Sequence, residues 1–511
     1  MKKILGIELG STRIKAVLID ENAKILAQGN HSWENILVDG LWSYSMEKID
    51  EGVKACYADL VKQYGDDIDT VDYLGVSGMM HGYMAFDKDD NLLVPFRTWR
   101  NTNTAEAAAE LSSVFRFNIP LRWSVAQYYQ SVLDRLPHVK DVAFLTTLSG
   151  YVHYRLTGQK VLGIDDASGM FPVSGRSYDQ DMMEKFNALL RTHGIHTNFE
   201  DLLPEVKLAG ECAGVLTPAG AKWLDESGKL KPGIPLCPPE GDMGTGMVAT
   251  CSVTPKTANV SSGTSANFTV VLDKPLQKYY REIDVVATPD GHPTALIHTN
   301  NCTSELDKWI NLFAQALSLF GAQIDKSELY AKLYTTALSC DENVGGITSY
   351  NFIAGEPLAG TVKGAPMVMR TQDGVMNLAN FMQAQIYSAI ATLALGMDIL
   401  EKEKVVIESV LAHGGFYKTD FVGQNATSAV LKAPVTVLQT ASEGGAWGMA
   451  LLALYASQSQ KDLSEFLADI FENIPKTVVM ADGQELRKCE NYMQRYRKEL
   501  QVQKAASNSN M

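Results

Sequence analysis

Two similar segments lie about half a chain length apart, and each places a short glycine and hydroxyl turn between two apolar runs. The first segment spans residues 4–20 with its turn at residues 10–12, and the second spans residues 258–273 with its turn at residues 263–265. A repeat spaced this widely indicates two related domains, because the repeats of solenoid proteins recur every 20–50 residues. The sequence therefore predicts two domains that each contain one strand–turn–strand unit.

Both turns are candidate phosphate-binding sites. A tight Gly-Ser/Thr hairpin exposes successive backbone N–H groups, and such concavities bind anions. Turns of this composition are common in hairpins, so a single copy would favour an ordinary turn. Two copies, one in each predicted domain, favour the binding of one nucleotide's phosphates from both sides.

Length and charge narrow the class of protein further. A chain of 511 residues exceeds what one core ordinarily supports, which also indicates two or more domains. The net charge of −14 argues against a nucleic-acid partner. No run of 18 apolar residues occurs, so we expect no membrane span, and Glu8 and Arg13 interrupt the apolar region that a signal peptide requires.

The cysteines favour a cytoplasmic protein. The chain has seven, an odd number, and they are scattered without a Cys-x-x-Cys pair. That pattern fits a reducing compartment and predicts no zinc site.

Strand and helix patterns alternate in both halves of the chain, as in an α/β protein. We place the domain boundary after the proline-rich residues 231–239, which gives domains at residues 1–250 and 251–490. Residues 491–511 are expected to be the end of a helix and then, from about residue 501, a disordered tail. The main expected strands are 4–9, 14–19, 25–27, 71–76, 258–273, 294–298 and 405–411, and the main helices are 46–63, 303–320, 326–340 and 376–402.

Asp242 is the candidate catalytic base. It follows the proline-rich stretch and precedes a predicted helix. Phosphoryl transfer needs a carboxylate that orients and deprotonates the attacking hydroxyl. An aspartate at this place is more often a helix N-cap, and the residues alone leave both roles open. No Gly-x4-Gly-Lys-Ser/Thr motif occurs, which argues against a P-loop kinase.

Two short segments contain candidate sugar-binding residues. Met80 and His81 follow the strand 71–76, at the end where open α/β sheets place ligand contacts. Trp99 and Asn101 lie in a dense polar and aromatic segment, and an indole can stack on a sugar while an amide reads its hydroxyls. A hydrogen-bonded structural histidine and a solvated turn with a helix cap are the alternative interpretations.

A pair of glycines follows the predicted strand 405–411. Gly414 and Gly415 would let a flat ligand approach the backbone closely, although a tight strand-to-helix turn would need the same residues.

Taken in order, these motifs resemble the FGGY carbohydrate kinases of the sugar kinase/actin/heat-shock-chaperone ATPase superfamily. The resemblance covers roughly residues 4–455. It rests on the two turns, on Leu-Trp-Ser at 41–43, on Ser-Gly-Met-Met-His-Gly at 77–82, on Gly-Asp at 241–242, on Ala-His-Gly-Gly at 412–415 with Gln-Asn-Ala at 424–426, and on Ser-Glu-Gly-Gly-Ala at 442–446. It implies two ribonuclease-H-like, actin-like ATPase domains that flank a nucleotide and sugar cleft.

The resemblance also implies an activity and its site. The activity is the ATP-dependent phosphorylation of a sugar hydroxyl, with a xylulose-like ketose as acceptor and Mg²⁺ as cofactor. Asp242 would be the base, and Glu8 and Asp242 would lie near the metal. Met80, His81, Trp99 and Asn101 would face the sugar. The nucleotide-binding residues that it implies are Gly10, Ser11, Thr12, Arg13, Gly263, Thr264, Gly414 and Gly415.

Two departures from the family pattern bear on metal and substrate. Glu8 stands where the family usually has Asp. Residues 99–103 read Trp-Arg-Asn-Thr-Asn where xylulokinases usually have Trp-Asn-Asp-x-Arg. Because amides replace a carboxylate and a guanidinium, we expect D-xylulose to be a poor or secondary substrate.

The rival functions are a glycerol or other polyol kinase on the same fold and a non-catalytic sugar-sensing module. We expect the sugar and ATP as partners, no nucleic acid and no membrane; a homodimer stays open.

Overall fold

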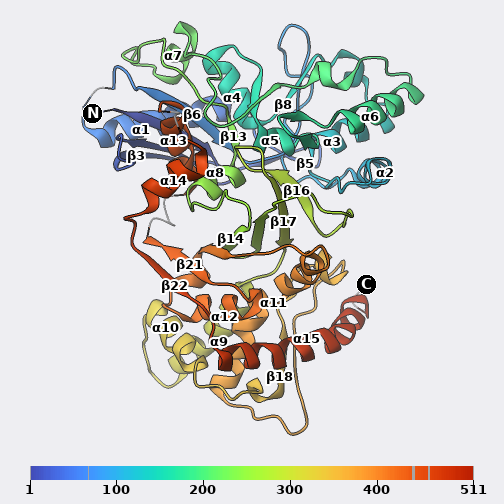
Figure 1. Ribbon diagram of the computed structural model, residues 1–511, viewed down its shortest axis with the longest axis vertical. Coiled ribbons are helices and arrows are strands. Elements are labelled where there is room, and N and C mark those ends of the chain that lie inside the picture. The colour runs from blue at the N-terminus through green and yellow to red at the C-terminus, as the bar shows by residue number, and fades with distance from the viewer. Residues whose placement is uncertain (1, 67, 440–443, 459–460, 510–511) are drawn as a thin grey trace.

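The computed structural model describes residues 2–66, 68–439, 444–458 and 461–509. Two α/β bodies lie one above the other, each around a mixed sheet (Figure 1). The first sheet has the strand order β13-β6-β1-β2-β3. Its strands are β1 (Ile4–Leu9), β2 (Arg13–Ile19), β3 (Ile25–Ser32), β6 (Tyr73–Gly78) and β13 (Glu240–Gly241).

The second sheet has seven strands in the order β16-β17-β15-β14-β20-β21-β22. They are β14 (Thr257–Ser262), β15 (Ala266–Val271), β16 (Asp284–Ala287), β17 (Pro293–Thr299), β20 (Ser409–His413), β21 (Val435–Leu438) and β22 (Lys476–Val479).

The two sheets share one arrangement, which confirms the predicted duplication. The hairpin β1–β2 is antiparallel, and β1 also pairs in parallel with β6. The hairpin β14–β15 is likewise antiparallel, and β14 pairs in parallel with β20. The same strand neighbours follow on both sides of each hairpin, so both domains have the expected ribonuclease-H-like core.

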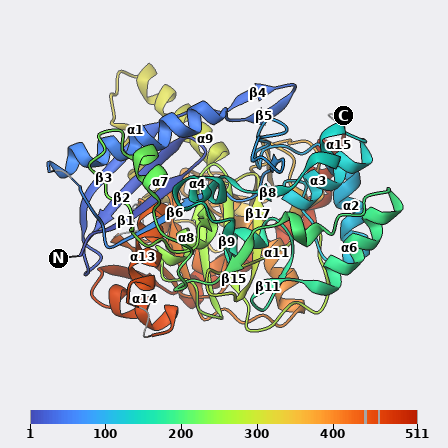
Figure 2. The same ribbon diagram turned by 90° about the horizontal axis from the view of Figure 1, so that it is seen from above.

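Helices cover both faces of the first sheet. Helix α1 (Met46–Tyr64) begins after Ser45, whose side chain accepts the N–H of Lys48, and ends at Gly65 in the left-handed conformation. It packs on β2 and β3, while α13 (Gly444–Ala456) packs on β1 and β6 from the other side (Figure 2). Because both faces are covered, β1 is an almost continuous apolar run instead of an alternating one.

Helix α13 departs from the predicted domain division. Its residues lie within the predicted C-terminal domain, yet the helix packs against the N-terminal sheet. A Cβ on Gly6 of β1 would lie 2.3 Å from the carbonyl oxygen of Ala446, so strand and helix are in direct backbone contact. Trp447 also donates its indole N–H to the carbonyl of Ala23. The N-terminal body therefore contains a segment from near the end of the chain.

The remaining elements surround these two sheets. The N-terminal body carries α2 (Ala105–Phe115), α3 (Ser124–Leu133), α4 (Leu148–Thr157), α5 (Ile164–Ser168), α6 (Gln180–Thr192), α7 (Pro218–Leu224) and α8 (Asp242–Val248), with the short strands β4 (Ile36–Val38), β5 (Leu41–Ser43), β7 (Met84–Phe86), β8 (Phe144–Thr146), β9 (Val161–Gly163), β10 (Val173–Ser174), β11 (Ser177–Tyr178) and β12 (Glu205–Lys207). The later part carries α9 (Ser304–Leu319), α10 (Lys326–Ala337), α11 (Leu378–Lys402), α12 (Val422–Leu431), α14 (Leu463–Phe471) and α15 (Gly483–Ser509), with β18 (Ile347–Tyr350) and β19 (Met367–Arg370).

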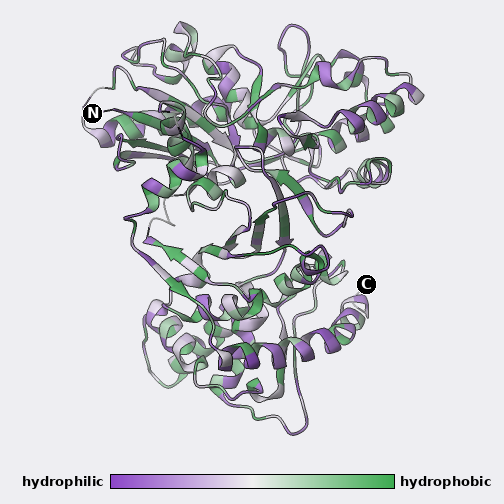
Figure 3. Cartoon of the chain, viewed as in Figure 1, coloured by the Kyte–Doolittle hydropathy of each residue, from purple (hydrophilic) through white to green (hydrophobic). Residues whose placement is uncertain are grey.

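The expected disordered tail is wrong for residues 501–509, because α15 continues to Ser509. Gln503 is buried, and its amide donates to the carbonyl of Ala365 and to the hydroxyl of Ser507. This last helix is largely hydrophilic along its length, whereas the strands of both sheets are mainly hydrophobic (Figure 3). Among the described residues, no helix is both long and apolar enough to cross a membrane.

Candidate active site

Glu8 lies near the end of β1, where three elements meet. The register places it beside Lys15 on β2 and Ser77 on β6. Its Oε2 accepts the backbone N–H of Ala446, near the start of α13, at 3.2 Å. Burial raises the pKa of Glu8, the charge of Asp242 raises it further, and Lys15 opposes both effects. Glu8 and Asp242 are therefore close enough for their charges to interact.

Asp242 is the first residue of α8, and the N-cap position belongs to Gly241. Its Oδ1 accepts the backbone N–H of Met80 at 3.2 Å. This hydrogen bond fixes the Asp242 side chain to the segment that follows β6. The side chain reaches solvent although protein surrounds it on most sides. Burial is the main cause that raises the pKa of Asp242, while the Met80 N–H and the charge of Arg122 lower it. Asp242 thus offers a carboxylate of raised basicity to an incoming group.

The first turn is held through its oxygen atoms by three aromatic side chains. The indole of Trp33 donates to the carbonyl of Gly10 at 2.7 Å, and the hydroxyl of Tyr44 donates to the carbonyl of Ser11 at 2.5 Å. Trp99 donates to the hydroxyl oxygen of Ser11 at 3.1 Å. Within the described chain, the backbone N–H groups of Ser11 and Thr12 have no acceptor. The turn is therefore fixed in place, and the N–H groups of Ser11 and Thr12 remain available as hydrogen-bond donors to a ligand.

The second turn is packed against the glycine pair. A Cβ on Gly414, whose φ is +110°, would lie 2.2 Å from the carbonyl oxygen of Ser262, so only glycine fits there. The N–H of Gly263 donates to Ser265 at 3.0 Å, and the N–H of Thr303 donates to the Gly263 carbonyl. The structure thus brings the second predicted phosphate site and the predicted nucleotide glycines into contact.

Met80 and His81 lie just after the end of β6, as predicted, and both are buried. His81 has a φ of +68°, and its Nδ1 lies 3.2 Å from the carbonyl oxygen of Gly169. Burial, helped by the charge of Arg122, holds the pKa of His81 well below its usual value, so the ring is neutral. A neutral ring that donates from Nδ1 keeps Nε2 as an acceptor. The structural and the binding interpretations of His81 are therefore compatible.

Asn101 does not have the position that we predicted for a sugar contact. Its Oδ1 accepts the N–H of Trp42 at 2.8 Å, and its Nδ2 donates to the carbonyls of Trp42 and Thr98 at 2.9 and 3.1 Å. Asn101 is also buried, so its amide is committed to the backbone. The amide-based expectation about D-xylulose loses its support, because the residue on which it depends holds a loop together. Trp99 remains partly exposed beside the first turn.

Sequence reasoning missed a cluster that links the two bodies near Asp242. Arg122 forms an ion pair with Asp284 of β16, and the amide of Asn118 donates to the same carboxylate at 2.8 Å. The charge of Arg122 influences the pKa of Asp242, His81 and His298, which come from both bodies. No local pattern marks these residues, because their partners are more than 160 positions away.

The residues present fit a divalent cation held mainly by ligands from the substrate. In the described part of the chain, no group of three or more His, Cys, Asp or Glu residues could hold a metal ion by itself. Glu8 and Asp242 are two carboxylates whose proximity raises the pKa of Glu8. Mg²⁺ commonly binds through one or two carboxylates, several waters and substrate phosphates, which matches this pair.

Comparison with known proteins decides the family. The model of the FGGY N-terminal domain of carbohydrate kinases matches residues 3–248, and that of the C-terminal domain matches residues 258–457. The chain belongs to the FGGY family of carbohydrate kinases. This membership makes the protein a phosphotransferase that uses ATP to phosphorylate an alcohol group of a sugar, and it confirms the predicted family and activity.

Of the helix-start motif at 442–446, Ser442 and Glu443 lie outside the described residues.

Named relatives of this FGGY kinase act on more than one substrate. The xylulose kinase of Haemophilus influenzae is 22% identical over 517 residues, which cover 97% of this chain and 98% of the relative. The structures of a xylulose kinase and of a gluconate kinase from Lactobacillus acidophilus each match with a TM-score of 0.81 at 17% identity, over 100% of both chains. At this identity the structures show the fold alone, and they confirm the predicted two-domain architecture.

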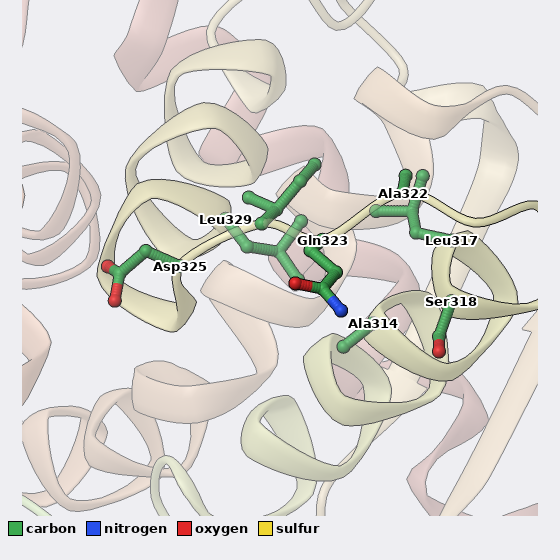
Figure 4. A pocket seen from close by; sticks show the side chains of 8 residues that line it. Ala314, Leu317, Ser318, Ala322, Gln323, Asp325 and Leu329 are labelled. Carbon is green, nitrogen blue, oxygen red and sulfur yellow. The ribbon is translucent and has the colours of Figure 1, made fainter.

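The described cavities do not mark the site. One, of about 410 Å³, lies between α9 and α10 and is lined by residues such as Leu317, Asp325 and Leu329 (Figure 4). It lies in the lower body of Figure 1, whereas Glu8 and Asp242 belong to the upper one. Its lining is mostly aliphatic, with one hydroxyl, one amide and the carboxylate that caps α10, so it offers no cluster of charged groups for phosphoryl transfer.

Proposed function

We propose that this FGGY kinase phosphorylates a ketose related to xylulose, with Asp242 as the general base. The observation that carries this assignment is the position of Asp242: an exposed carboxylate of raised pKa, fixed by the Met80 N–H and next to Glu8. A base of raised pKa takes a proton from a hydroxyl more readily than an ordinary aspartate. Asp242 accepts the proton of the sugar hydroxyl as that oxygen attacks the terminal phosphate of ATP.

The nucleotide is held by the two turns and the glycine pair. Ser11 and Thr12 offer backbone N–H groups without a protein acceptor, and Thr264 is exposed on the opposite turn. Lys15, beside Glu8 in the sheet register, adds a positive charge. The residues assigned to nucleotide binding are Gly10, Ser11, Thr12, Arg13, Gly263, Thr264, Gly414 and Gly415.

Mg²⁺ fits beside Glu8 and Asp242. When bound, it neutralises charge on the phosphate oxygens. Glu8 is fixed by the Ala446 N–H and would face the water shell of the metal.

A second acceptor, an acidic sugar such as gluconate, is favoured by one observation. Arg122 lies near Asp242, and only one of its nitrogens forms a described ion pair, with Asp284. A guanidinium has five donors, so it can also bind a carboxylate. The ketose remains first, because four of the named relatives are xylulose kinases and one is a gluconokinase.

An ADP-release assay of the purified full chain with D-xylulose, D-gluconate and glycerol tests these assignments. Faster ATP turnover with D-xylulose than with the other two supports the ketose. A tenfold higher kcat/KM for gluconate or glycerol would replace it by the acidic sugar or the polyol. If none of these sugars, nor any of a wider panel of ketoses and polyols, accelerated ATP turnover, the sensing module would become the better assignment.

We also assign the protein to the cytoplasm. All seven cysteines are free, as expected in a reducing compartment.

A further inference from the structure

The helix that begins with Asp242 has no cap of its own. Its N-cap residue is Gly241, which has no side chain to accept the first N–H groups of the helix. The acceptor comes from α5 instead. Oδ2 of Asp165 accepts the N–H of Gly241 at 2.9 Å and the N–H of Gly244 at 3.1 Å. These two donors flank Asp242 on both sides, so one buried carboxyl group is hydrogen-bonded to the backbone before and after the proposed base.

The backbone at both donors is shaped to this carboxyl group. A Cβ on Gly241 would lie 2.8 Å from Oδ2 of Asp165, and a Cβ on Gly244 would lie 2.5 Å from its Cγ. A side chain at Gly244 would displace Asp165, and one at Gly241 would displace both Asp165 and Met80, whose Cγ would lie 2.2 Å from the added Cβ. Asp165 itself is fully buried. This contact therefore accounts for two glycines that flank Asp242, which the roles assigned so far leave unexplained.

The other oxygen of Asp165 lies in a buried polar region. Oδ1 of Asp165 has no hydrogen-bond partner among the described residues. The charge of Asp165 raises the pKa of Glu240, which shows that the two acids are neighbours. An amide in place of the Asp165 carboxyl could keep its oxygen on Gly241 and Gly244 and turn its NH₂ toward Glu240.

We propose that Asp165 is a positioning residue for phosphoryl transfer, because it fixes the start of α8 and so aims the Asp242 carboxylate. The inference rests on the proposed role of Asp242. Displacing a reacting group by about 1 Å can lower a rate by about 100-fold. Loss of the two hydrogen bonds frees the first turn of α8 while leaving the phosphate turns, which lie on other elements, in place. Loss of these two hydrogen bonds should therefore lower kcat and leave the KM for ATP unchanged.

Asp166 provides a matched control. It is the next residue, it is equally buried, and its Oδ2 accepts the hydroxyls of Thr147 and Ser149 instead of α8. A second pair lies in α8 itself. Gly244→Ala would displace Asp165, whereas a Cβ on Gly246 meets no atom within 4 Å. Alanine favours helix more than glycine does, so a slower Gly244→Ala enzyme could not be explained by a weaker helix.

The experiment compares Asp165→Ala, Asp165→Asn and Asp166→Ala in the full chain with the best acceptor. We expect Asp165→Ala to lose at least tenfold in kcat with the KM for ATP within twofold, while Asp165→Asn and Asp166→Ala keep kcat within threefold. Amide hydrogen exchange of residues 240–248 should become faster in Asp165→Ala alone. If Asp165→Ala does not fold, Gly244→Ala should show the same loss and Gly246→Ala should not.

A folded Asp165→Ala or Gly244→Ala enzyme that keeps kcat within threefold of wild type would overturn the inference. An equal loss of kcat in Asp166→Ala would overturn it as well, since the effect would then be general to buried acids. The exchange measurement does not depend on activity. If the wild-type amides at 240–248 exchange slowly but the wild-type protein is inactive, the proposed function is wrong. If exchange at these amides is unchanged in Asp165→Ala, the positioning role is wrong.

Discussion

At the scale of single residues, the site brings together several carboxyl groups whose protein surroundings favour the protonated form. Burial raises the pKa of Glu8, Asp165, Glu240 and Asp242. Asp242 and Glu8 could be chosen from the sequence because they lie beside glycine-rich motifs. The role of Asn101 could not, because its partner Trp42 lies 59 positions away and only the folded loop brings them together.

Asp242→Asn tests the base. The amide is nearly isosteric but cannot take a proton, so we expect kcat to fall by about 10²- to 10⁴-fold with ATP affinity nearly unchanged. In the wild-type enzyme, the raised pKa of Asp242 means that kcat should decline with falling pH earlier than an ordinary aspartate would cause. Steady-state kinetics from pH 5 to 8 measure both effects. A variant that keeps more than about a tenth of wild-type kcat would rule out a general-base role.

Glu8→Gln tests the metal assignment. The substitution keeps the shape of the side chain and its acceptor for the Ala446 N–H, but removes the charge. We expect a higher concentration of free Mg²⁺ to be needed for half-maximal rate, because a neutral amide attracts the hydrated cation less strongly. Titration of activity against free Mg²⁺ provides the measurement. Superimposable curves would make Glu8 a structural residue only.

At the scale of elements, local patterns predicted most helices and strands correctly, and long-range packing explains the failures. The apolar spacing that predicted a helix at 46–63 corresponds to α1, with an N-cap at Ser45 and a terminating Gly65. The end of α15 was missed because its polar sequence resembles a solvated tail, and because the amide of Gln503 donates to the carbonyl of Ala365, which lies 138 positions away. The three aromatic donors to the first turn were equally invisible, since Trp33, Tyr44 and Trp99 follow it by tens of residues.

The second turn supplies an element-scale prediction. A Cβ on Gly263 meets no atom within 4 Å, so Gly263→Ala should fold like the wild type. If the backbone of this turn touches phosphate, the added methyl will crowd the nucleotide and raise the KM for ATP several-fold, before it affects the sugar. Thr264→Val, which removes an exposed hydroxyl, should act in the same direction. Unchanged ATP kinetics with weakened sugar binding would show that the turn serves the other ligand.

At the scale of the whole molecule, the two bodies are joined both by contacts between them and by the chain, which passes from one body to the other more than once. The ion pair of Arg122 with Asp284 links them, as does the hydrogen bond from the Ala287 N–H to the hydroxyl of Ser168. Helix α13 then returns to the first sheet. Sequence could predict two domains from the repeated hairpin, but α13 is apolar on all sides, so its pattern does not say which sheet it covers.

Gly6→Ala probes this return of the chain. The new methyl would lie 2.3 Å from the Ala446 carbonyl oxygen, so α13 must move away from β1. We expect the free energy of unfolding to fall by about 1–3 kcal/mol, as for other overpacked cores. Urea unfolding followed by circular dichroism measures it, with Gly263→Ala as a control in open space. Equal free energies of unfolding for the two variants would mean that α13 moves away from β1 without loss of stability.

Buried acids should also set how the stability of the molecule depends on pH. Burial raises the pKa of Asp166 from 3.8 to about 7. Between these values the unfolded chain has lost the proton that the folded protein keeps, so stability falls as pH rises through this window. We expect a lower Tm at pH 8 than at pH 5.5, and a smaller difference in Asp166→Asn. A wild-type Tm that rises over this range would contradict the assignment.

The return of α13 has a consequence for the order in which the molecule is made. The N-terminal sheet is complete once Gly241 has been synthesised, but the face of β1 and β6 that α13 covers stays bare until residue 456 has left the ribosome. At about 5–20 residues per second, the wait from residue 241 to residue 456 is about 10–40 s. During that time a nascent chain exposes an apolar sheet face, which is the kind of surface that chaperones bind. Slow stretches of translation between these positions would therefore lengthen the period in which this kinase is prone to aggregate.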